Sequence, residues 1–322
     1  MRIAVVGGGG FVGRHLSLAL LKRSHEVLVY DNLSARAGAG DQTWLEPFQF
    51  AHADVLDRPR LRSEFLSFRP ELIYHLAALH YIPYCDQHPE ETLQVNVAGT
   101  LNLMLACERL PQLRGIVFAS SVAVYPPTDG YHSETGPAQP SDIYGLSKLL
   151  GEQIVNLYAR KCGVSHIAAR LANIYGPDET NSHVIPAIVD QLLAGADILH
   201  LGRTDPCRDF LYVEDLAEGL AAAIPFLLRD EIHETVNFGP GQEWPVQEAI
   251  NILCQLSGRD VRCVTDQDRV RPVERMHLRA RVEHAREWMG WTPRHDLRAG
   301  LEKTFAWERT NHAPLLATAE KA

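Results

Sequence analysis

The sequence has few cysteines and no long apolar run, and each absence excludes a class of protein. Its 322 residues include six cysteines, none in a C-x-x-C pair, so a disulfide scaffold is not indicated. No apolar run approaches the roughly 18 residues of a membrane helix. The chain opens with a short apolar run that meets four glycines at once, which leaves no room for the apolar core of a secretory signal. We therefore expect a cytoplasmic protein with no membrane segment.

Positive charge is also scarce. The chain has 31 Lys and Arg against 40 Asp and Glu, and 31 − 40 gives a net charge of −9. Binding to nucleic acid or to an anionic membrane surface needs a positive field, so neither partner is expected. A small anionic ligand held by a few local arginines remains compatible with this balance. The sequence shows no internal repeat and no low-complexity segment.

The first half of the chain alternates short apolar runs with amphipathic segments. Each run has four to six residues, the length of a buried parallel strand. Strands are expected at 3–6, 26–30, 48–53, 72–76 and 116–119, and helices at 11–21 and 91–109. Such alternation predicts βαβ units and a doubly wound parallel sheet, which binds its ligands at the carboxyl ends of the strands.

The pattern loosens after about residue 170, where Ile174-Tyr175-Gly176-Pro177 is a turn signal. Helices are expected at 186–194, 213–228, 245–256 and 297–307, with a strand at 235–238. We predict an α/β protein with a Rossmann-type doubly wound parallel sheet and a smaller α+β C-terminal substrate domain. Residues 1–170 would form the first domain, with elements near 209–240 returning to it, and 171–322 would mainly form the second.

A glycine-rich turn follows the first expected strand and opens a helix. Its spaced glycines are Gly7, Gly10 and Gly13. Gly7 permits a tight turn, Gly10 lets the backbone approach a pyrophosphate, and Gly13 packs helix against strand. The helix start, Phe11 and Val12, adds free N–H groups and a positive dipole end to the expected cofactor site.

An acid ends the second expected strand. Asp31 lies eighteen residues after Gly13, where it can accept a hydrogen bond from a ribose 2′-hydroxyl and would repel a 2′-phosphate. Arg36 is near enough to accept such a phosphate, but we favour NAD over NADP. Asn32 and Ser34 are assigned to the same site, so residues 1–170 form the expected NAD-binding domain.

Tyr144 and Lys148 are four residues apart on an expected helix and so point the same way. A free phenol has a pKa near 10 and is a poor base at neutral pH, but a nearby ammonium together with the positive nicotinamide ring favours the phenolate. A tyrosine and a lysine four residues apart are common by chance. Next to a dinucleotide site, however, the pair predicts a group that transfers a proton as an alcohol and a ketone interconvert. Ser120 and Ser121 follow the strand at 116–119, and we favour Ser121 as the hydroxyl that holds the substrate oxygen.

Taken together, these segments resemble the extended short-chain dehydrogenase/reductase family, the NAD-dependent nucleotide-sugar epimerase/dehydratase group. The resemblance covers nearly the whole chain and rests on many motifs rather than on one. The matching segments are GGGGFVG, YDNLS, HADVLD, YHLAA, NVAGT, FASSVAVY, YGLSK, RLANIYGP, CRDFLYVEDLAEG, VNFGPG, RVRPVE and MGWTP.

The resemblance implies further roles. Ser121, Tyr144 and Lys148 would be the catalytic set, Asp54 and Val55 would flank adenine, and Asn96 would lie near the nicotinamide. The cofactor cleft would be lined by Leu76, Ala77 and Ala78, and a nucleotide-sugar substrate would face Asn173, Arg208 and Arg271. We add His183 and Val184 to the substrate site and expect no metal.

The family's shared first step is oxidation of a sugar hydroxyl, usually at C4. Dehydratases and decarboxylases of the family usually carry an acid just after the Ser/Thr position, and this chain has Val122 and Ala123 there. We therefore expect a 4-epimerase, acting on a UDP-hexose, hexosamine or hexuronate. The alternatives are a nucleotide-ketosugar reductase or dehydrogenase, then a dehydratase or decarboxylase, and last a non-enzymatic NAD-sensing protein.

Three other features bear on the site and the assembly. His80, in an unusually aromatic loop, either touches the sugar or packs, and Cys207 beside Arg208 is interpreted as structural. Pro126 stands where the family usually has glycine. Apolar residues on more than one face of two expected helices predict a homodimer formed through a helix bundle; they are Leu93, Val97, Leu101 and Met104, and Leu146, Leu150, Ile154 and Tyr158.

Overall fold

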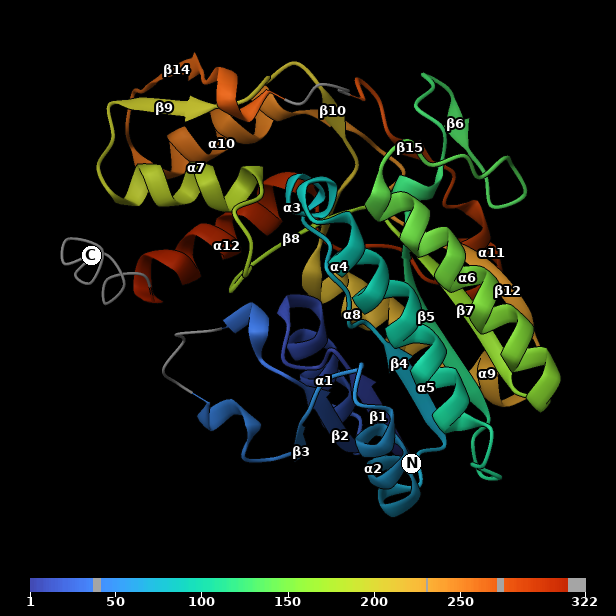
Figure 1. Ribbon diagram of the computed structural model, residues 1–322. Helices are drawn as coiled ribbons and strands as arrows, with labels where there is room; N and C mark the ends of the chain where they lie inside the picture. The colour runs from blue at the N-terminus through green and yellow to red at the C-terminus, as the bar shows by residue number, and fades with distance from the viewer. Residues whose placement is uncertain (37–41, 230, 271–274, 312–322) are drawn as a thin grey trace.

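The computed structural model describes residues 1–36, 42–229, 231–270 and 275–311. Its centre is a parallel sheet of seven strands in the order β12-β7-β5-β4-β1-β2-β3 (Figure 1). The predicted Rossmann-type α/β fold is thereby confirmed. The strands of this sheet are β1 (Arg2–Val6), β2 (Glu26–Asp31), β3 (Gln49–His52), β4 (Leu72–His75), β5 (Gly115–Ser121), β7 (Ser165–Leu171) and β12 (His233–Phe238).

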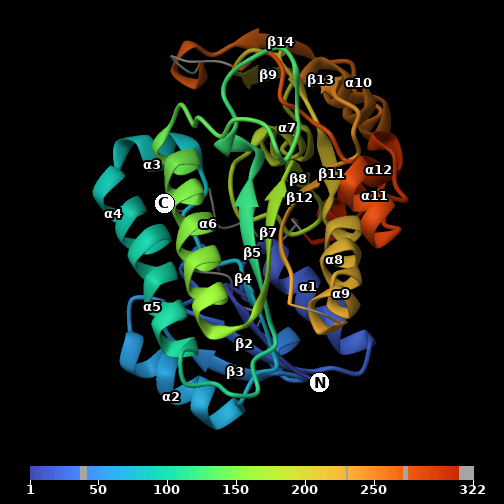
Figure 2. The ribbon, with the colours of Figure 1, turned by 90° about the vertical axis from the view of Figure 1, so that its right-hand side faces the viewer.

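Helices cover both faces of the sheet, and for this reason the central strands are apolar along their length (Figure 2). Residues Ile3–Val6 of β1 are completely buried. One face carries α1 (Phe11–Lys22), α8 (Val213–Ala222), α9 (Ile224–Arg229) and α11 (Glu283–Met289). The other carries α2 (Arg58–Phe68), α5 (Gly99–Cys107) and α6 (Ile143–Cys162).

Smaller elements form a second region at the carboxyl ends of the sheet strands (Figure 1). Its apolar core is shared by α7, α10, α12 and the strand β9. The helices are α3 (Ile82–Gln87), α7 (Val184–Leu193), α10 (Val246–Ser257) and α12 (Leu297–Asn311). The paired short strands are β6 (Tyr131–His132) with β15 (Arg279–Ala280), β8 (Asn173–Tyr175) with β11 (Phe210–Tyr212), β9 (Ile198–Leu201) with β14 (Arg262–Thr265), and β10 (Cys207–Arg208) with β13 (Trp244–Pro245).

Two expected helices are interrupted. The helix expected at 91–109 is divided into α4 (Pro89–Leu93), a π-helical turn at Gln94–Ala98, and α5. The π turn places the Asn96 amide where it bonds a neighbouring loop, a typical use of such turns. The helix expected at 213–228 breaks after α8, because Pro225 has no N–H to continue the ladder.

One strand of the sheet was not expected at all. Strand β7 has the sequence SHIAARL, and its polar residues His166 and Arg170 are buried. Arg170 donates to both carboxylate oxygens of Glu152 at 2.8 Å, so the charge is compensated by a partner on α6. Within the described ranges, no helix is both long and apolar enough to cross a membrane.

Candidate functional site

The turn after β1 is packed so closely that two of its glycines cannot carry a side chain. Gly7 has φ +83°, and a Cβ there would lie 2.4 Å from the backbone nitrogen of Ala77. A Cβ on Gly13 would lie 2.1 Å from the Gly7 carbonyl oxygen. Gly10 differs, because its nearest neighbour would be 3.5 Å away, so the protein itself leaves room for a methyl group there. Gly10 is also the N-cap of α1 and offers no side chain to the helix amides.

The carboxylate of Asp31 fastens this turn to the end of β2. Its two oxygens accept the N–H groups of Gly9 at 2.9 Å and Leu33 at 2.6 Å. A carboxylate oxygen has a second lone pair, so each can still accept a ribose hydroxyl. Asn32 donates to the Asp54 carboxylate at 2.7 Å, which joins the ends of β2 and β3.

The other predicted cofactor residues lie around the same edge. Phe11 is buried and Val12 half-buried in the first turn of α1, and Val55 is buried beside the end of β3. Ser34 begins a 3-10 turn that ends at Arg36, whose side chain lies outside the described part of the chain. The described residues among these lie near the carboxyl ends of β1, β2 and β3, at one edge of the sheet.

The chain leaving β4 passes directly over the glycine turn. The N–H groups of Leu76 and Ala77 both donate to the Val6 carbonyl, at 2.7 and 3.0 Å. Beyond Ala78, the Asn96 side chain accepts from Leu79 N at 2.8 Å and donates to Leu79 O at 2.9 Å. Asn96 also donates to the Ser147 hydroxyl on α6 at 2.9 Å. Asn96 thus holds the β4 loop against the helix that carries Tyr144.

Ser121, Tyr144 and Lys148 come together at the carboxyl end of β5. Asp142 caps α6 by accepting the Gly145 N–H at 2.7 Å, which fixes the first turn and with it Tyr144. Ser121 shares a hydrogen bond with the Tyr144 phenol. The Lys148 ammonium lies 5.8 Å from the centre of the Tyr144 ring and donates to the Ala119 carbonyl at 2.7 Å.

The protein groups around Tyr144 do not by themselves favour the phenolate, and the expectation accordingly included the positive nicotinamide ring as well. Burial raises the pKa of Tyr144 above its ordinary value, and the hydrogen bond with Ser121 only partly opposes that effect. Burial also lowers the pKa of Lys148 to about 8. The nearby ammonium therefore does not by itself offset the loss of solvent around the phenol. An additional positive charge or hydrogen-bond donor beside Tyr144 is needed to make the phenolate accessible at neutral pH.

The two serines at the end of β5 have different partners. Ser120 donates at 2.5 Å to Glu152, the buried carboxylate that also pairs with Arg170. Ser121 instead accepts the Ala123 N–H at 3.1 Å and faces Tyr144. Ser120 is thus part of the core. Of the two serines, Ser121 is the one that faces Tyr144.

His80 lies in the loop after β4 and is fixed through both ring nitrogens. Its Nε2 accepts from the Asn181 amide at 3.0 Å, and the ring also bonds the Ala78 carbonyl. Burial lowers the pKa of His80 to about 3, so the ring is neutral at physiological pH. This arrangement favours a packing and positioning role over proton transfer.

The ring of His183 lies beside that of His80, with 5.6 Å between the ring centres. Its Nδ1 bonds Glu179, whose side chain is 3% exposed. Burial raises the pKa of that carboxyl well above its usual range. The ring of Tyr81 also lies 5.6 Å from that of His183, so an aromatic and polar wall forms at the start of α7, beside Val184. Glu179 and Asn181 were not predicted from the sequence, because neither lies in one of the matching segments.

Arg208 is held by two backbone oxygens. Its Nη1 donates to Cys207 O and to Arg275 O, both at 2.8 Å. Asn173 begins β8, which pairs with β11 just after Arg208. Arg271, the other predicted phosphate ligand, lies outside the described residues.

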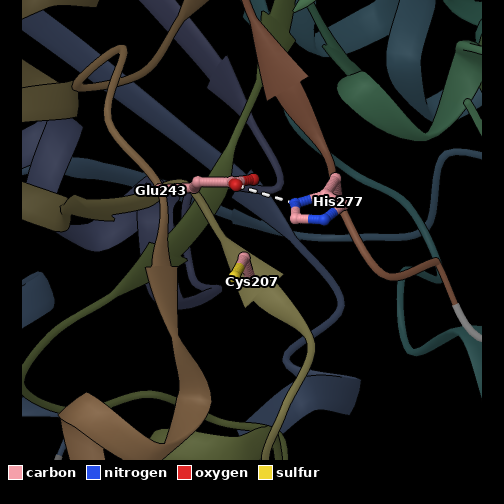
Figure 3. Close-up of side chains that lie close together, drawn as sticks. All are labelled: Cys207, Glu243 and His277. Atoms are coloured by element: carbon pink, nitrogen blue, oxygen red, sulfur yellow. Dashed lines mark hydrogen bonds and ion pairs between the residues drawn. The ribbon is translucent and has the colours of Figure 1, made fainter. Parts of the chain in front are cut away.

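Cys207, Glu243 and His277 form a further cluster next to Arg208 (Figure 3). Their ligand atoms lie within 4.8 Å of one another, so by residue type they could hold a metal ion. However, Arg279 donates to Glu243 at 2.5 Å and Glu243 also bonds His277 at 2.7 Å. Burial raises the pKa of the Cys207 thiol, which disfavours the thiolate that binds metals. The geometry is that of an ion-pair network, in line with a structural role for Cys207.

Comparison with known proteins gives a consistent result. The NAD dependent epimerase/dehydratase family model matches residues 3–239. UDP-glucose 4-epimerase of Azospirillum brasilense is 30% identical, with 96% of this chain and 92% of that protein covered. UDP-glucuronic acid decarboxylase 1 of Xenopus tropicalis is 29% identical, over 96% of this chain and 72% of that protein.

Solved structures agree with these sequence relatives. The UDP-glucuronic acid 4-epimerase of Bacillus cereus, in complex with UDP-glucuronic acid and NAD, superposes with a TM-score of 0.87 at 25% identity. The match covers 96% of this chain and 99% of that one. With a glycine turn, an acid after β2 and a Ser-Tyr-Lys set in place, the chain belongs to the NAD-dependent epimerase/dehydratase family.

Proposed function

We propose that this protein is an NAD-dependent nucleotide-sugar 4-epimerase. The observation that carries the proposal concerns Ser121, which lies with Tyr144 and Lys148 at the end of β5. In the sequence, Ser121 is followed directly by Val122 and Ala123. Both following residues are buried and apolar, with 4% and 5% of their surface exposed. The site therefore has one proton-transfer group at C4 and no acid where the family's dehydratases and decarboxylases usually carry one.

NAD is the cofactor of this family, and the residues of the glycine turn fit it. Gly10 carries no side chain at the start of α1, the α1 amides have no side-chain cap, and Asp31 presents a carboxylate at the end of β2. The first two features suit a pyrophosphate, and the Asp31 carboxylate suits a ribose hydroxyl. We assign the cofactor to this turn together with Asn32, Ser34, Asp54, Val55 and the Leu76–Ala78 segment. When bound, NAD supplies the acceptor, and later the donor, of the hydride at C4.

Tyr144 is assigned as the general base and then the general acid for the C4 hydroxyl. Ser121 holds the same oxygen and keeps the phenol oriented through their shared hydrogen bond. Lys148 places its positive charge beneath the phenol ring, 5.8 Å from the ring centre. Rotation of the 4-keto sugar before the proton and hydride return would invert C4 without a second acid–base pair.

The substrate's nucleoside diphosphate is assigned to Arg208 and Arg271, and its remaining contacts to Asn173 and Val184. A guanidinium can bind phosphate oxygens in a bidentate manner, and the backbone bonds to Arg208 hold it in place. The wall formed by His80 and His183 would face the sugar. A UDP-hexose, hexosamine or hexuronate is the proposed substrate class.

A homodimer is proposed from the surface of α5 and α6. Leu146 and Leu157 of α6 are 39% and 66% exposed, which is unusual for large apolar side chains on one helix. A second copy of this helix pair would cover them. Light scattering at micromolar concentration should then give twice the mass of the chain, and the mass of a monomer would contradict the proposal.

Product analysis tests the proposed reaction. The NAD-loaded protein would be incubated separately with UDP-glucose, UDP-glucuronic acid and UDP-N-acetylglucosamine, with Tyr144→Phe as the matched control. We expect NMR to show the C4 epimer of one of these sugars, with no net NADH formed. A 4-keto-6-deoxy product, loss of carbon dioxide, or one NADH per sugar would instead identify a dehydratase, a decarboxylase or a dehydrogenase.

A further inference from the structure

Residues 275–281, here called the strap, lie against the turn after β5 and the start of α6. The strap begins at Arg275 and contains β15, which pairs with β6. Leu278 and Ala280 of the strap pack against Val122 and Val124, in the turn that follows Ser121. The strap is therefore a direct neighbour of the strand end and of the helix that carry the proton-transfer residues.

Arg275 is the residue that joins the strap to that helix. Its Nη2 lies 3.1 Å from the Asp142 carboxylate, 2.9 Å from the Ser141 hydroxyl and 3.2 Å from the Ala123 carbonyl. The Arg275 and Asp142 side chains are only 10% and 12% exposed, so solvent screens their ion pair weakly. One guanidinium thus contacts both the cap of α6 and the turn after Ser121.

The same residue also reaches the proposed phosphate site. The Arg275 carbonyl accepts the Arg208 guanidinium at 2.8 Å, and the next residue, Met276, accepts the Cys207 N–H at 2.8 Å. The backbone of Arg275 accordingly contacts Arg208, which is proposed to bind the diphosphate. The side chain of Arg275 contacts Asp142, the cap of the helix that carries Tyr144.

We propose that Arg275 is a positioning residue that sets both the place and the electrostatic environment of Tyr144 by holding and neutralising Asp142. The inference rests on the proposed function, because it assigns Tyr144 the proton transfer at C4. Arg275 contributes a fixed positive charge close to the start of α6, where Tyr144 is the second residue.

The charges around Tyr144 show why this matters. Lys148 approaches it from the same helix, Cys85 from α3 and Asp142 from the cap. Asp86 of α3 accepts the N–H of Ile143, the residue before Tyr144, at 3.3 Å. The Asp142 charge raises the pKa of Tyr144, so it opposes formation of the phenolate. A guanidinium paired with Asp142 cancels much of that field while leaving the carboxylate free to accept the Gly145 N–H.

Two single substitutions should therefore move the pH dependence in opposite directions. Arg275→Gln leaves Asp142 unneutralised, and we expect the acidic limb of the kcat profile to shift upward by about 0.5–1 pH unit. Asp142→Asn keeps an amide oxygen for the cap and removes the negative charge, so the limb should shift downward by a similar amount. The double variant should return to within about 0.3 pH unit of the wild type, because both charges are gone.

Three further variants separate positioning from general damage. Arg275→Lys keeps the charge and should keep the wild-type pH limb, but it cannot serve three acceptors and should lower kcat by roughly threefold to tenfold. Arg279→Gln removes an arginine from the same strap, where its partners are Glu243 and His277, and should leave the limb in place. KM for the nucleotide sugar should change less than about threefold in Arg275→Gln, because the carbonyl that holds Arg208 is retained.

The decisive readout is the order of the pH midpoints. Equal midpoints in Arg275→Gln, Asp142→Asn and the wild type would overturn the inference, even if kcat fell in both variants. Should Arg275→Gln fail to fold, the downward shift of Asp142→Asn alone decides, since its cap is preserved. If the wild type epimerises no sugar, the proposed function fails separately. The ultraviolet titration of tyrosinate in the NAD-bound proteins, taken against Tyr144→Phe, then gives the same comparison without a substrate.

Discussion

The proposed cofactor side and the proposed substrate side of this site are held in place by different means. On the cofactor side, Gly7 and Gly13 leave no space for a methyl group, and backbone bonds join the turn to β2 and β4. On the substrate side, side chains hold one another, across two loops in the His80–Asn181 pair and within one loop in the His183–Glu179 pair. A backbone cradle tolerates almost no substitution, whereas a wall of paired side chains can change when both partners change.

This difference is compatible with a family whose members include a UDP-glucose 4-epimerase and a UDP-glucuronic acid decarboxylase. The glycines of the cradle lie within the short stretch from Gly7 to Gly13, although the backbone that Gly7 packs against is that of Ala77. The wall depends on pairs that are about 100 residues apart in the case of His80 and Asn181. Tyr144 lies between the two sides, and variants on either side of it test how separate they are.

The largest effect is expected for Tyr144→Phe, which removes the proton-transfer group but not the ring. Turnover should fall by roughly 10²–10⁴-fold, the usual contribution of a general acid–base group. NAD binding, measured by calorimetry, should be largely retained because the phenol is not a main anchor of the cofactor. Near-wild-type turnover in a pure sample would exclude Tyr144 from the proton transfer.

The next effect concerns the substrate side alone. Arg208→Lys and Arg271→Lys should each raise KM for the nucleotide sugar by roughly 10–150-fold, since one charge-assisted contact is worth ~1.5–3 kcal/mol. The dissociation constant of NAD should stay unchanged in both. If neither variant changes KM, the nucleotide-sugar assignment itself fails.

The sequence predicts these two sides unequally. The turn GGGGFVG, Asp31 and the Tyr144–Lys148 pair are local patterns, and the fold brings them to one edge of the sheet. The π turn at Asn96 and the buried strand β7 were missed, because their polar residues are satisfied by partners from other elements, Ser147 and Glu152. The Arg275–Asp142 contact could not be foreseen for the same reason, although an aspartate two residues before the tyrosine does suggest a helix cap.

A smaller effect should distinguish two glycines of the same turn. Gly7→Ala should lower the free energy of unfolding by about 1–3 kcal/mol, because the residue has φ +83° and its Cβ would meet the Ala77 backbone. Gly10→Ala should leave the free energy of unfolding without ligand within about 0.5 kcal/mol of the wild type. It should nevertheless weaken NAD binding, because its methyl group would occupy the approach to the pyrophosphate. Urea unfolding and calorimetry measure the two quantities, and unimpaired NAD binding in Gly10→Ala would place the pyrophosphate elsewhere.

The smallest effect concerns the stability cost of the buried ammonium that serves Tyr144. The Lys148 side chain is 3% exposed, and burial lowers its pKa from 10.5 to about 8. Between these two pH values the unfolded chain binds more protons than the folded one, so stability should rise with pH across that window. Below about pH 8 the cost is fully present, and Lys148→Met should therefore raise the free energy of unfolding at pH 7 by on the order of 1–3 kcal/mol.

That gain should shrink as the pH approaches 10.5, where the wild-type lysine no longer carries its cost. Lys161→Met is the matched control, since Lys161 lies on the same helix, is 65% exposed and pairs with Glu108. It should not gain stability at neutral pH. Urea unfolding at pH 7 and pH 10 measures all three proteins, and an equal response of the two variants would show that Lys148 imposes no cost. The expected result is a protein that is more stable and inactive, because the charge that weakens the fold is the one placed beneath the Tyr144 ring.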